Sequence, residues 1–239
     1  MSRPRGDPVT LPPAEPPTHT TLTGRTVQLV LLSASYAEDL FPLVNNDHPD
    51  QTAIWDYIPV EGPYDEIEPL RKDLEAKATS TDPLFYAVID TRHDSKTKGK
   101  AIGYISLMSI VPTHMRLEIG HVVFTKALQR TVGATEAIYL LLKHSIEDLG
   151  YRRIEWKCDS LNAPSKRAAE RLGFTFEGTF RQHFIVKGRN RDTAWLSILR
   201  EEWWGLKNLK GALEGWLDES NFDAEGKQRR KLEDFRSVV

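Results

Sequence analysis

The sequence predicts an α/β domain with a mixed central sheet of about seven strands, flanked by about four helices and followed by a C-terminal helical extension. Helical and strand periodicities alternate along residues 22–200. Several strand patterns are separated only by short turns. Such turns are long enough for antiparallel hairpins and too short for the crossover that parallel strands need. Apolar residues also recur at helical spacing after residue 200. A sheet that combines hairpins with helix-linked strands is mixed.

The first half of the predicted domain contains three strands and two helices. The strand patterns are rich in β-branched and aliphatic residues, and the second helix has acidic residues in its first turn. In chain order these are a strand over 26–32, helices over 35–44 and 64–80, and strands over 84–90 and 101–111 joined by a charged turn.

The second half contains four strands and two helices. Each helix ends at a glycine, Gly150 and Gly173, as C-caps favour. One strand alternates cleanly, so Trp156 and Cys158 face away from Lys157. In chain order these are a strand over 116–124, a helix over 134–149, a strand over 152–159, a helix over 163–172, and strands over 175–187 and 192–200.

Composition is that of a soluble globular protein, with 40% hydrophobic and 28% charged residues among 239. A net charge of -2 argues against nucleic-acid and membrane-surface partners. Cys158 is the single cysteine, so no intrachain disulfide and no thiolate metal site is expected. No spaced histidine pair indicates a metal either. We also find no apolar run of about 20 residues and no signal-peptide core, and we expect a cytoplasmic protein.

The chain divides into three segments. Residues 1–21 hold six of the 14 prolines and are expected to form a disordered arm. Residues 22–200 form the predicted domain, and residues 201–239 the helical extension. The apolar stripe of the extension packs on the domain or on a second subunit, so a homodimer is one arrangement it allows. This stripe comprises Leu206, Leu209, Leu213, Trp216 and Leu217.

The stretch "QRTVGATEA" (129–137) lies where a strand leads into a helix. A helix N-terminus presents unpaired N–H groups and a partial positive charge, which together bind anions such as phosphate. Small side chains at Ala134 and Thr135 leave these groups accessible, and Arg130 adds a positive charge. The alternative is an ordinary corner with Thr131 as N-cap. The stretch is neither a P-loop nor a dinucleotide fingerprint.

Four stretches, taken in order, carry a family resemblance. They are "EIGHVVF" (118–124), "QRTVGATEA" (129–137), "NAPS" (162–165) and "RLGFTFEGTFR" (171–181). With these motifs, residues 22–200 resemble the GNAT superfamily of acyl-CoA-dependent N-acyltransferases, and most closely its RimL-like branch. The resemblance implies the GNAT fold, acetyl-CoA as co-substrate, no metal, and a small-molecule or peptide amine as acceptor.

The resemblance also implies a set of cofactor-binding residues. The N–H groups of the loop are expected to hold the CoA pyrophosphate, although Val132 stands where the superfamily usually has a glycine. N–H groups on the preceding strand are expected to meet the thioester oxygen and the pantetheine amides. Asn162 either binds the pantetheine arm or caps the following helix. The predicted set is Val122, Val123, Phe124, Gln129, Arg130, Thr131, Val132, Gly133, Ala134, Thr135 and Asn162.

Direct attack of an amine on a thioester needs a base, because a free alkylamine is mostly protonated at pH 7. Glu118 is the first candidate, and a salt bridge is its alternative role. Ser165 matches a position where relatives carry a general acid, or is simply a first-turn serine. Trp55 and Tyr57 lie in an aromatic loop that covers the acceptor site in similar enzymes, or else they pack in the core.

Two other functions remain open. Lys187, Arg189 and Arg191 cluster in a turn that is either solvated or binds an acidic group, such as the second carboxylate of succinyl-CoA. The chain could instead be a catalytically silent acyl-CoA-binding or scaffold module, which the Val132 departure favours. His121 and Asp159 would be replacement bases if Glu118 were structural.

Overall fold

The computed structural model describes residues 3–59, 62–205 and 207–236. Within these residues one sheet of eight strands is formed, which is one more than expected because a two-residue strand, β1, precedes the seven predicted ones. The strands are β1 (Leu22–Thr23), β2 (Val27–Leu31), β3 (Leu84–Asp90), β4 (Ala101–Val111), β5 (Arg116–Phe124), β6 (Arg153–Asp159), β7 (Thr175–Val186) and β8 (Arg189–Leu199).

The predicted mixed sheet is confirmed. Its strand order is β1-β2-β3-β4-β5-β6-β8-β7. Neighbouring strands are antiparallel except for β5 and β6, which are parallel. A parallel pair needs a crossover connection, and α4 supplies it between β5 and β6.

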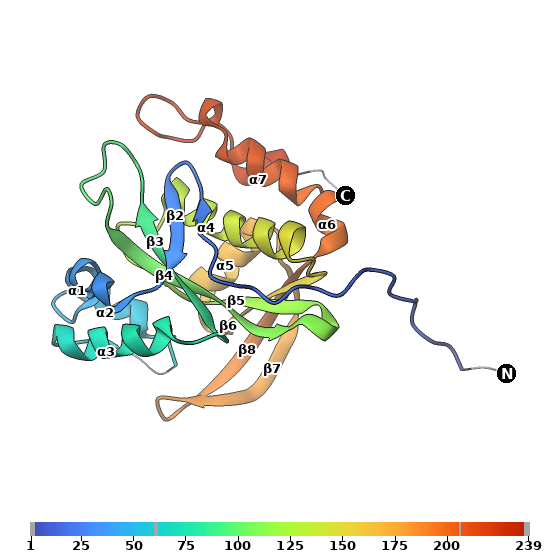
Figure 1. The fold of residues 1–239 in the computed structure, drawn as a ribbon, viewed down its shortest axis with the longest axis horizontal. Coiled ribbons are helices and arrows are strands. Elements are labelled where there is room, and N and C mark those ends of the chain that lie inside the picture. Colours follow the sequence, from blue (N-terminus) through green and yellow to red (C-terminus); the bar gives the residue numbers. More distant parts are fainter. Residues whose placement is uncertain (1–2, 60–61, 206, 237–239) are drawn as a thin grey trace.

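Helices cover both faces of this sheet (Figure 1). Helices α1–α3 lie on one face, α4 and α5 on the other, and α7 packs over α4. The helix predicted over 134–149 begins two residues earlier, and its last turn is a π-helical segment, η4 (His144–Asp148). The helices are α1 (Ala37–Val44), α2 (Pro49–Thr52), α3 (Ile67–Ala78), α4 (Val132–Lys143), α5 (Ala163–Leu172), α6 (Arg200–Trp204) and α7 (Leu209–Leu217). None of those described is long and apolar enough to cross a membrane.

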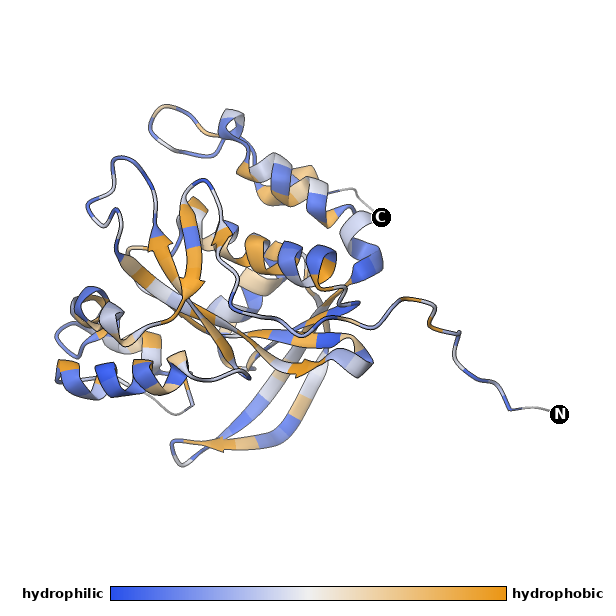
Figure 2. Ribbon diagram, viewed as in Figure 1, coloured by the Kyte–Doolittle hydropathy of each residue, from blue (hydrophilic) through white to orange (hydrophobic). Residues whose placement is uncertain are grey.

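Alternation along the strands creates two cores. On β3, Tyr86 and Val88 enter the core beneath α4, whereas Phe85 and Ala87 enter the core beneath α1 and α3. The central strands are therefore apolar almost throughout, while the β7–β8 hairpin mixes polar and apolar residues (Figure 2). The centre of the sheet is therefore buried on both faces, whereas β7, at its edge, is mostly exposed.

The extension packs on its own domain. Leu209, Leu213, Trp216 and Leu217 are all buried in the core that includes α4. Leu206, which belongs to the same predicted stripe, lies outside the described residues. Of the two arrangements that the stripe allowed, the chain shows packing within one molecule.

The proline-rich arm contacts the domain near its end. Residues 3–13 are exposed and form no helix or strand. Ala14 is buried, and the N–H of Glu15 donates to the carbonyl of Leu149 at 2.8 Å. The hydroxyl of Tyr86 donates to the carbonyl of Thr18 at 3.3 Å. The arm is thus attached to the domain from Ala14 to Thr18.

Candidate active site

The parallel strands β5 and β6 separate part-way along the sheet. Their ladder joins Arg116–Glu118 to Arg153–Glu155 and records no pair beyond Glu118. From there β5 follows β4, and β6 follows β8. The gap between them belongs to a groove of about 2220 Å³. Glu118 therefore stands at the closed end of an opening in the sheet.

Backbone donors of β5 face this opening. The N–H of Thr125 donates to the carbonyl of Ile102 on β4 at 3.4 Å. Because successive N–H groups of a strand point to opposite sides, the N–H of Phe124 points toward the gap. The side chain of Val122 lines the groove, whereas that of Val123 is buried beneath α1 and α3. The N–H of Val123, like that of Thr125, points toward β4, so Val123 presents neither its side chain nor its N–H to the gap.

The loop before α4 opens onto the same groove. Gln129 Nε2 donates to the carbonyl of Phe124 at 2.7 Å and so ties the loop to the end of β5. Thr131 caps the helix, since its Oγ1 accepts from the N–H of Ala134 at 3.4 Å. The N–H groups of Val132 and Gly133 have no acceptor among the described residues. The helix N-terminus thus keeps backbone donors for an anion.

The glycine of this loop has a packing role. A Cβ added at Gly133 would lie 2.7 Å from Cγ1 of Val27, so a larger residue would push α4 away from β2. Arg130, with φ of 59°, takes the left-handed conformation instead. Val132 is the first residue of α4, where no glycine is required. The departure at Val132 therefore leaves the helix start intact.

The start of α5 forms another wall. Asn162 Oδ1 accepts from the N–H of Ser165 at 3.1 Å, so Asn162 caps the helix, and both residues line the groove. The Oγ of Ser165 accepts from the indole N–H of Trp156 at 3.0 Å. Its own hydroxyl hydrogen can therefore point to another acceptor.

Glu118 is buried and belongs to an ion pair. Its Oε2 accepts from Nζ of Lys157 at 2.6 Å and from Oγ of Ser109 at 3.3 Å. Lys157 also donates to Oε2 of Glu155 at 2.7 Å. Oε1 of Glu118 accepts no hydrogen bond from the described residues, and a Cβ added at Gly120 would lie 3.5 Å from it. The salt-bridge role is confirmed, and one carboxylate oxygen remains unused.

The surroundings of Glu118 favour proton uptake. Burial raises the pKa of Glu118 above its ordinary value of 4.5, and the charge and hydrogen bond of Lys157 limit this rise. A carboxylate with a raised pKa accepts a proton more readily, while the neighbouring ammonium favours its charged form. A general base needs both a pKa high enough to accept a proton and a charged form that is available to do so.

The two predicted aromatic contacts lie in different environments. Trp55 is 1% exposed, donates its indole N–H to the carbonyl of Val44 at 2.8 Å, and stacks edge-on against Tyr64 at 5.3 Å. Trp55 therefore lies in the core and does not reach the groove. Tyr57 does line the groove, and its hydroxyl donates to the carbonyl of Leu161 at 3.2 Å.

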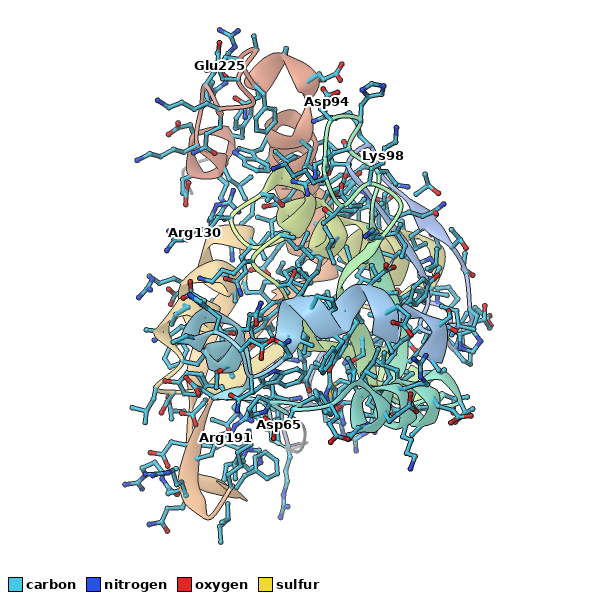
Figure 3. The ribbon with its side chains drawn as sticks, turned by 90° about the vertical axis from the view of Figure 1, so that its left-hand side faces the viewer. Asp65, Asp94, Lys98, Arg130, Arg191 and Glu225 are labelled. Carbon is cyan, nitrogen blue, oxygen red and sulfur yellow. The ribbon has the colours of Figure 1, made fainter. Side chains whose placement is uncertain are left out.

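The β7–β8 hairpin adds another wall, of which the sequence had indicated only the basic turn with Lys187, Arg189 and Arg191 as a candidate site for an acidic group. Trp195 lines the groove with its ring centroid 4.2 Å from Nζ of Lys157, and His183, Arg191 and Thr193 line it nearby. The alternation along 152–159 turns Lys157 away from the core, which was the only indication in the sequence that Lys157 faces this side of the sheet. Glu225, Arg130 and Arg191, which all line the groove, follow one another down the left-hand side of Figure 3. No cluster of metal-ligating side chains occurs in the described chain.

Comparisons with known proteins agree on one family. The model of the acetyltransferase (GNAT) domain matches residues 27–175. YdaF of Bacillus subtilis (strain 168), named provisionally as a ribosomal N-acetyltransferase, is 30% identical over 109 residues, or 46% of this chain and 59% of its own length. The chain thus matches less than two thirds of that relative.

Solved structures extend the likeness over almost the whole chain. A GCN5-related N-acetyltransferase from Brucella melitensis is 41% identical, with a TM-score of 0.86, covering 93% of this chain and 96% of its own. The Microcin C7 self-immunity acetyltransferase MccE, solved with acetyl-CoA and AMP, shares the fold at 23% identity and a TM-score of 0.61, covering 74% of this chain and 93% of its own.

Proposed function

Because the chain belongs to the GNAT family of acetyltransferases, we propose that it transfers an acetyl group from acetyl-CoA to a primary amine by direct attack on the thioester. The observation that carries this proposal is the gap between β5 and β6, with unpaired N–H groups of α4 at its mouth and Glu118 at its closed end. An extended thioester fits such a gap, and alignment of the two reactants supplies a large part of the rate.

The donor is placed by backbone groups. The N–H groups of residues 130–135 that remain unpaired, those of Val132 and Gly133 above all, hold the pyrophosphate, and Arg130 adds a charge. The pantetheine arm runs along Val122, Val123 and Phe124 toward Glu118, past Asn162. The N–H of Phe124 points into the gap beside the loop and is placed for a pantetheine amide. The N–H of Val122, which points to the same side and lies two residues nearer Glu118, is the better-placed donor for the thioester oxygen, which gains negative charge during attack.

Glu118 takes the proton of the amine. The free Oε1 accepts it, directly or through water, while Lys157 stays bound to Oε2. The neutral amine nitrogen then bonds to the thioester carbon, the carbon–sulfur bond breaks, and the nitrogen releases its second proton to solvent as the amide forms. Removal of this proton by a positioned base contributes about 10²–10⁴-fold.

The leaving thiolate is protonated on the other face of β6. Ser165 supplies the proton and regains one from solvent, and the indole N–H of Trp156 donates to its oxygen throughout. Alternation along β6 places Trp156 and Lys157 on opposite faces, so acid and base approach the thioester from opposite sides. The thiol pKa of ~8.5 makes this step the less demanding one.

An acceptor screen tests the function. The chain is incubated with acetyl-CoA and panels of primary amines, including polyamines, amino-acid derivatives and peptides that begin like ribosomal proteins, and the released thiol is detected. Calorimetry with CoA runs in parallel. Turnover of an amine supports the enzyme, and binding without any turnover supports the silent module. A chain that neither binds CoA nor releases thiol contradicts both.

A further inference from the structure

One face of β8 presents polar side chains to the groove. Arg191, Thr193 and Trp195 are two residues apart and therefore point to the same side of the sheet. In the β6–β8 ladder, Trp195 is the direct partner of Lys157, and Thr193 that of Asp159. All three line the groove. This face continues directly from the carboxylate pair around Lys157 toward the tip of the hairpin.

Four polar atoms in this region are buried without a hydrogen-bond partner. They are Nε of Arg191, Oγ1 of Thr193, Nε1 of Trp195 and Nδ1 of His183. The side chain of Thr193 is 0% exposed. Buried polar groups in folded proteins are nearly always paired, and a gathering of exceptions requires an explanation. A ligand that accepts hydrogen bonds would supply the partner that the three donors on β8 lack.

Two carboxylates beside this face accept hydrogen bonds from backbone N–H groups. Oδ1 of Asp159 accepts from the N–H of Leu161 at 2.9 Å, and Oδ1 of Asp192 accepts from the N–H of Gln182 at 2.7 Å. Arg191 forms no ion pair within the described chain. Its closest aromatic contact is the ring of Phe184, 5.9 Å from its guanidinium carbon. Arg191 therefore has no ion-pair partner among the described residues, whereas Lys157 is paired with two glutamates.

We infer that Arg191, Thr193 and Trp195 form a subsite that binds a carboxylate carried by one of the two substrates. A guanidinium, a hydroxyl and an indole N–H can all donate, and a carboxylate offers about four lone-pair positions to receive them. The inference rests on the proposed function and narrows its substrates. The carboxylate comes either from the acceptor amine or from the acyl group of a dicarboxylic acyl-CoA such as succinyl-CoA.

Two substrate comparisons separate these sources. In the first, acetyl-CoA is offered ω-amino acids of increasing length beside their primary amides, which differ only in the charge. In the second, succinyl-CoA is compared with acetyl-CoA on uncharged amines. A preference for the free acids over the amides places the carboxylate on the acceptor, and a preference for succinyl-CoA places it on the donor.

Matched variants then test whether Arg191 and Thr193 cause the preference for a carboxylate. Arg191→Gln should lower kcat/KM for the preferred, charged substrate by about 10- to 100-fold, as expected for a lost hydrogen bond to a charged group. The loss should be several-fold smaller for the uncharged analogue, so the preference for the charged substrate falls. Thr193→Val, which keeps the shape and removes the hydroxyl, should lower kcat/KM for the charged substrate by about 3- to 10-fold. Arg189→Gln is the control, because Arg189 is exposed on the same hairpin and does not line the groove.

Failure of the carboxylate subsite can be distinguished from failure of the proposed acetyltransferase function. If the wild-type chain turns over no amine, the proposed function fails, and calorimetry of succinate and ω-amino acids on the CoA-saturated protein tests the subsite directly. Binding that Arg191→Gln abolishes and Arg189→Gln retains supports the subsite. Wild-type binding or turnover without preference for a carboxylate, or an equal loss for charged and uncharged ligands in Arg191→Gln, overturns it.

Discussion

Replacement of Lys157 by methionine should destabilise the protein through Glu118. The change removes ion pairs of 2.6 Å to Glu118 and 2.7 Å to Glu155. Glu155 keeps Arg153 at 2.8 Å, whereas Glu118 keeps only the hydroxyl of Ser109. Removal of one partner of a buried pair costs about 3–5 kcal/mol. Because a single carboxylate is left unpaired and can take up a proton, we expect a loss near the lower limit, about 3 kcal/mol at neutral pH.

The loss should depend on pH in a definite direction. Burial already raises the pKa of Glu118, and without Lys157 it should rise further. A carboxyl group with a folded-state pKa above its unfolded value contributes stability that is present below the unfolded pKa and is lost as pH rises through the folded pKa. Lys157→Met should therefore approach the wild type near pH 4.5, the ordinary value, and differ most above neutrality.

Thermal unfolding across this pH range measures the effect. A loss of 3 kcal/mol corresponds to about 6–12 °C for a chain of this size. Lys143→Met is the control, because Lys143 is 40% exposed in its 3.9 Å pair with Glu147 and should change little. Glu118→Gln combined with Lys157→Met should recover much of the stability, since no charge is left unpaired. An equal loss at pH 4.5 and pH 8 would refute the assignment to Glu118.

Two further predictions concern the loop and the aromatic residues. Val132→Pro should weaken CoA binding and keep the fold, because proline is favoured at the first helical position and Thr131 already has the extended backbone (φ -102°, ψ 166°) that a following proline requires; calorimetry beside Val132→Ala, which keeps the N–H, measures this, and unchanged CoA affinity would count against the loop. Trp55→Ala should lose about 3–5 kcal/mol of stability, whereas Tyr57→Phe should lose about 1 kcal/mol or less; denaturant unfolding distinguishes them, and a mild effect of Trp55→Ala would contradict its core position.

Periodicity was sufficient to predict most of the sheet. The strands over 84–90, 101–111 and 116–124 match β3, β4 and β5 because long runs of β-branched and aliphatic residues leave no competing pattern. The hairpin turn was less well predicted. β8 begins at Arg189, three residues before the expected strand, because polar residues beside a turn give no periodic signal.

The sequence predicted the parts of the site that depend on neighbouring residues. It did not predict the parts that bring together residues far apart in the chain. Thr131 and Asn162 cap helices, which neighbouring residues in the sequence already indicate. The pairing of Glu118 with Lys157 joins residues 39 positions apart, and it depends on the register of a parallel pair that no single-sequence pattern specifies. Trp55 stood in the same aromatic stretch as Tyr57, and only the fold separates a core ring from a groove ring.

Glu118→Gln, assayed for turnover and for acetyl-CoA binding together, tests the account most directly. The variant keeps the shape of the side chain, and Lys157 keeps Glu155, so the strand should stay in place. With an amine identified by the screen, kcat should fall by about 10²–10⁴-fold, and the loss should shrink as pH rises and more amine is already neutral. Acetyl-CoA affinity should remain that of the wild type. Unchanged turnover would contradict the role of Glu118 as base, and lost binding together with a lower melting temperature would show that it serves the fold alone.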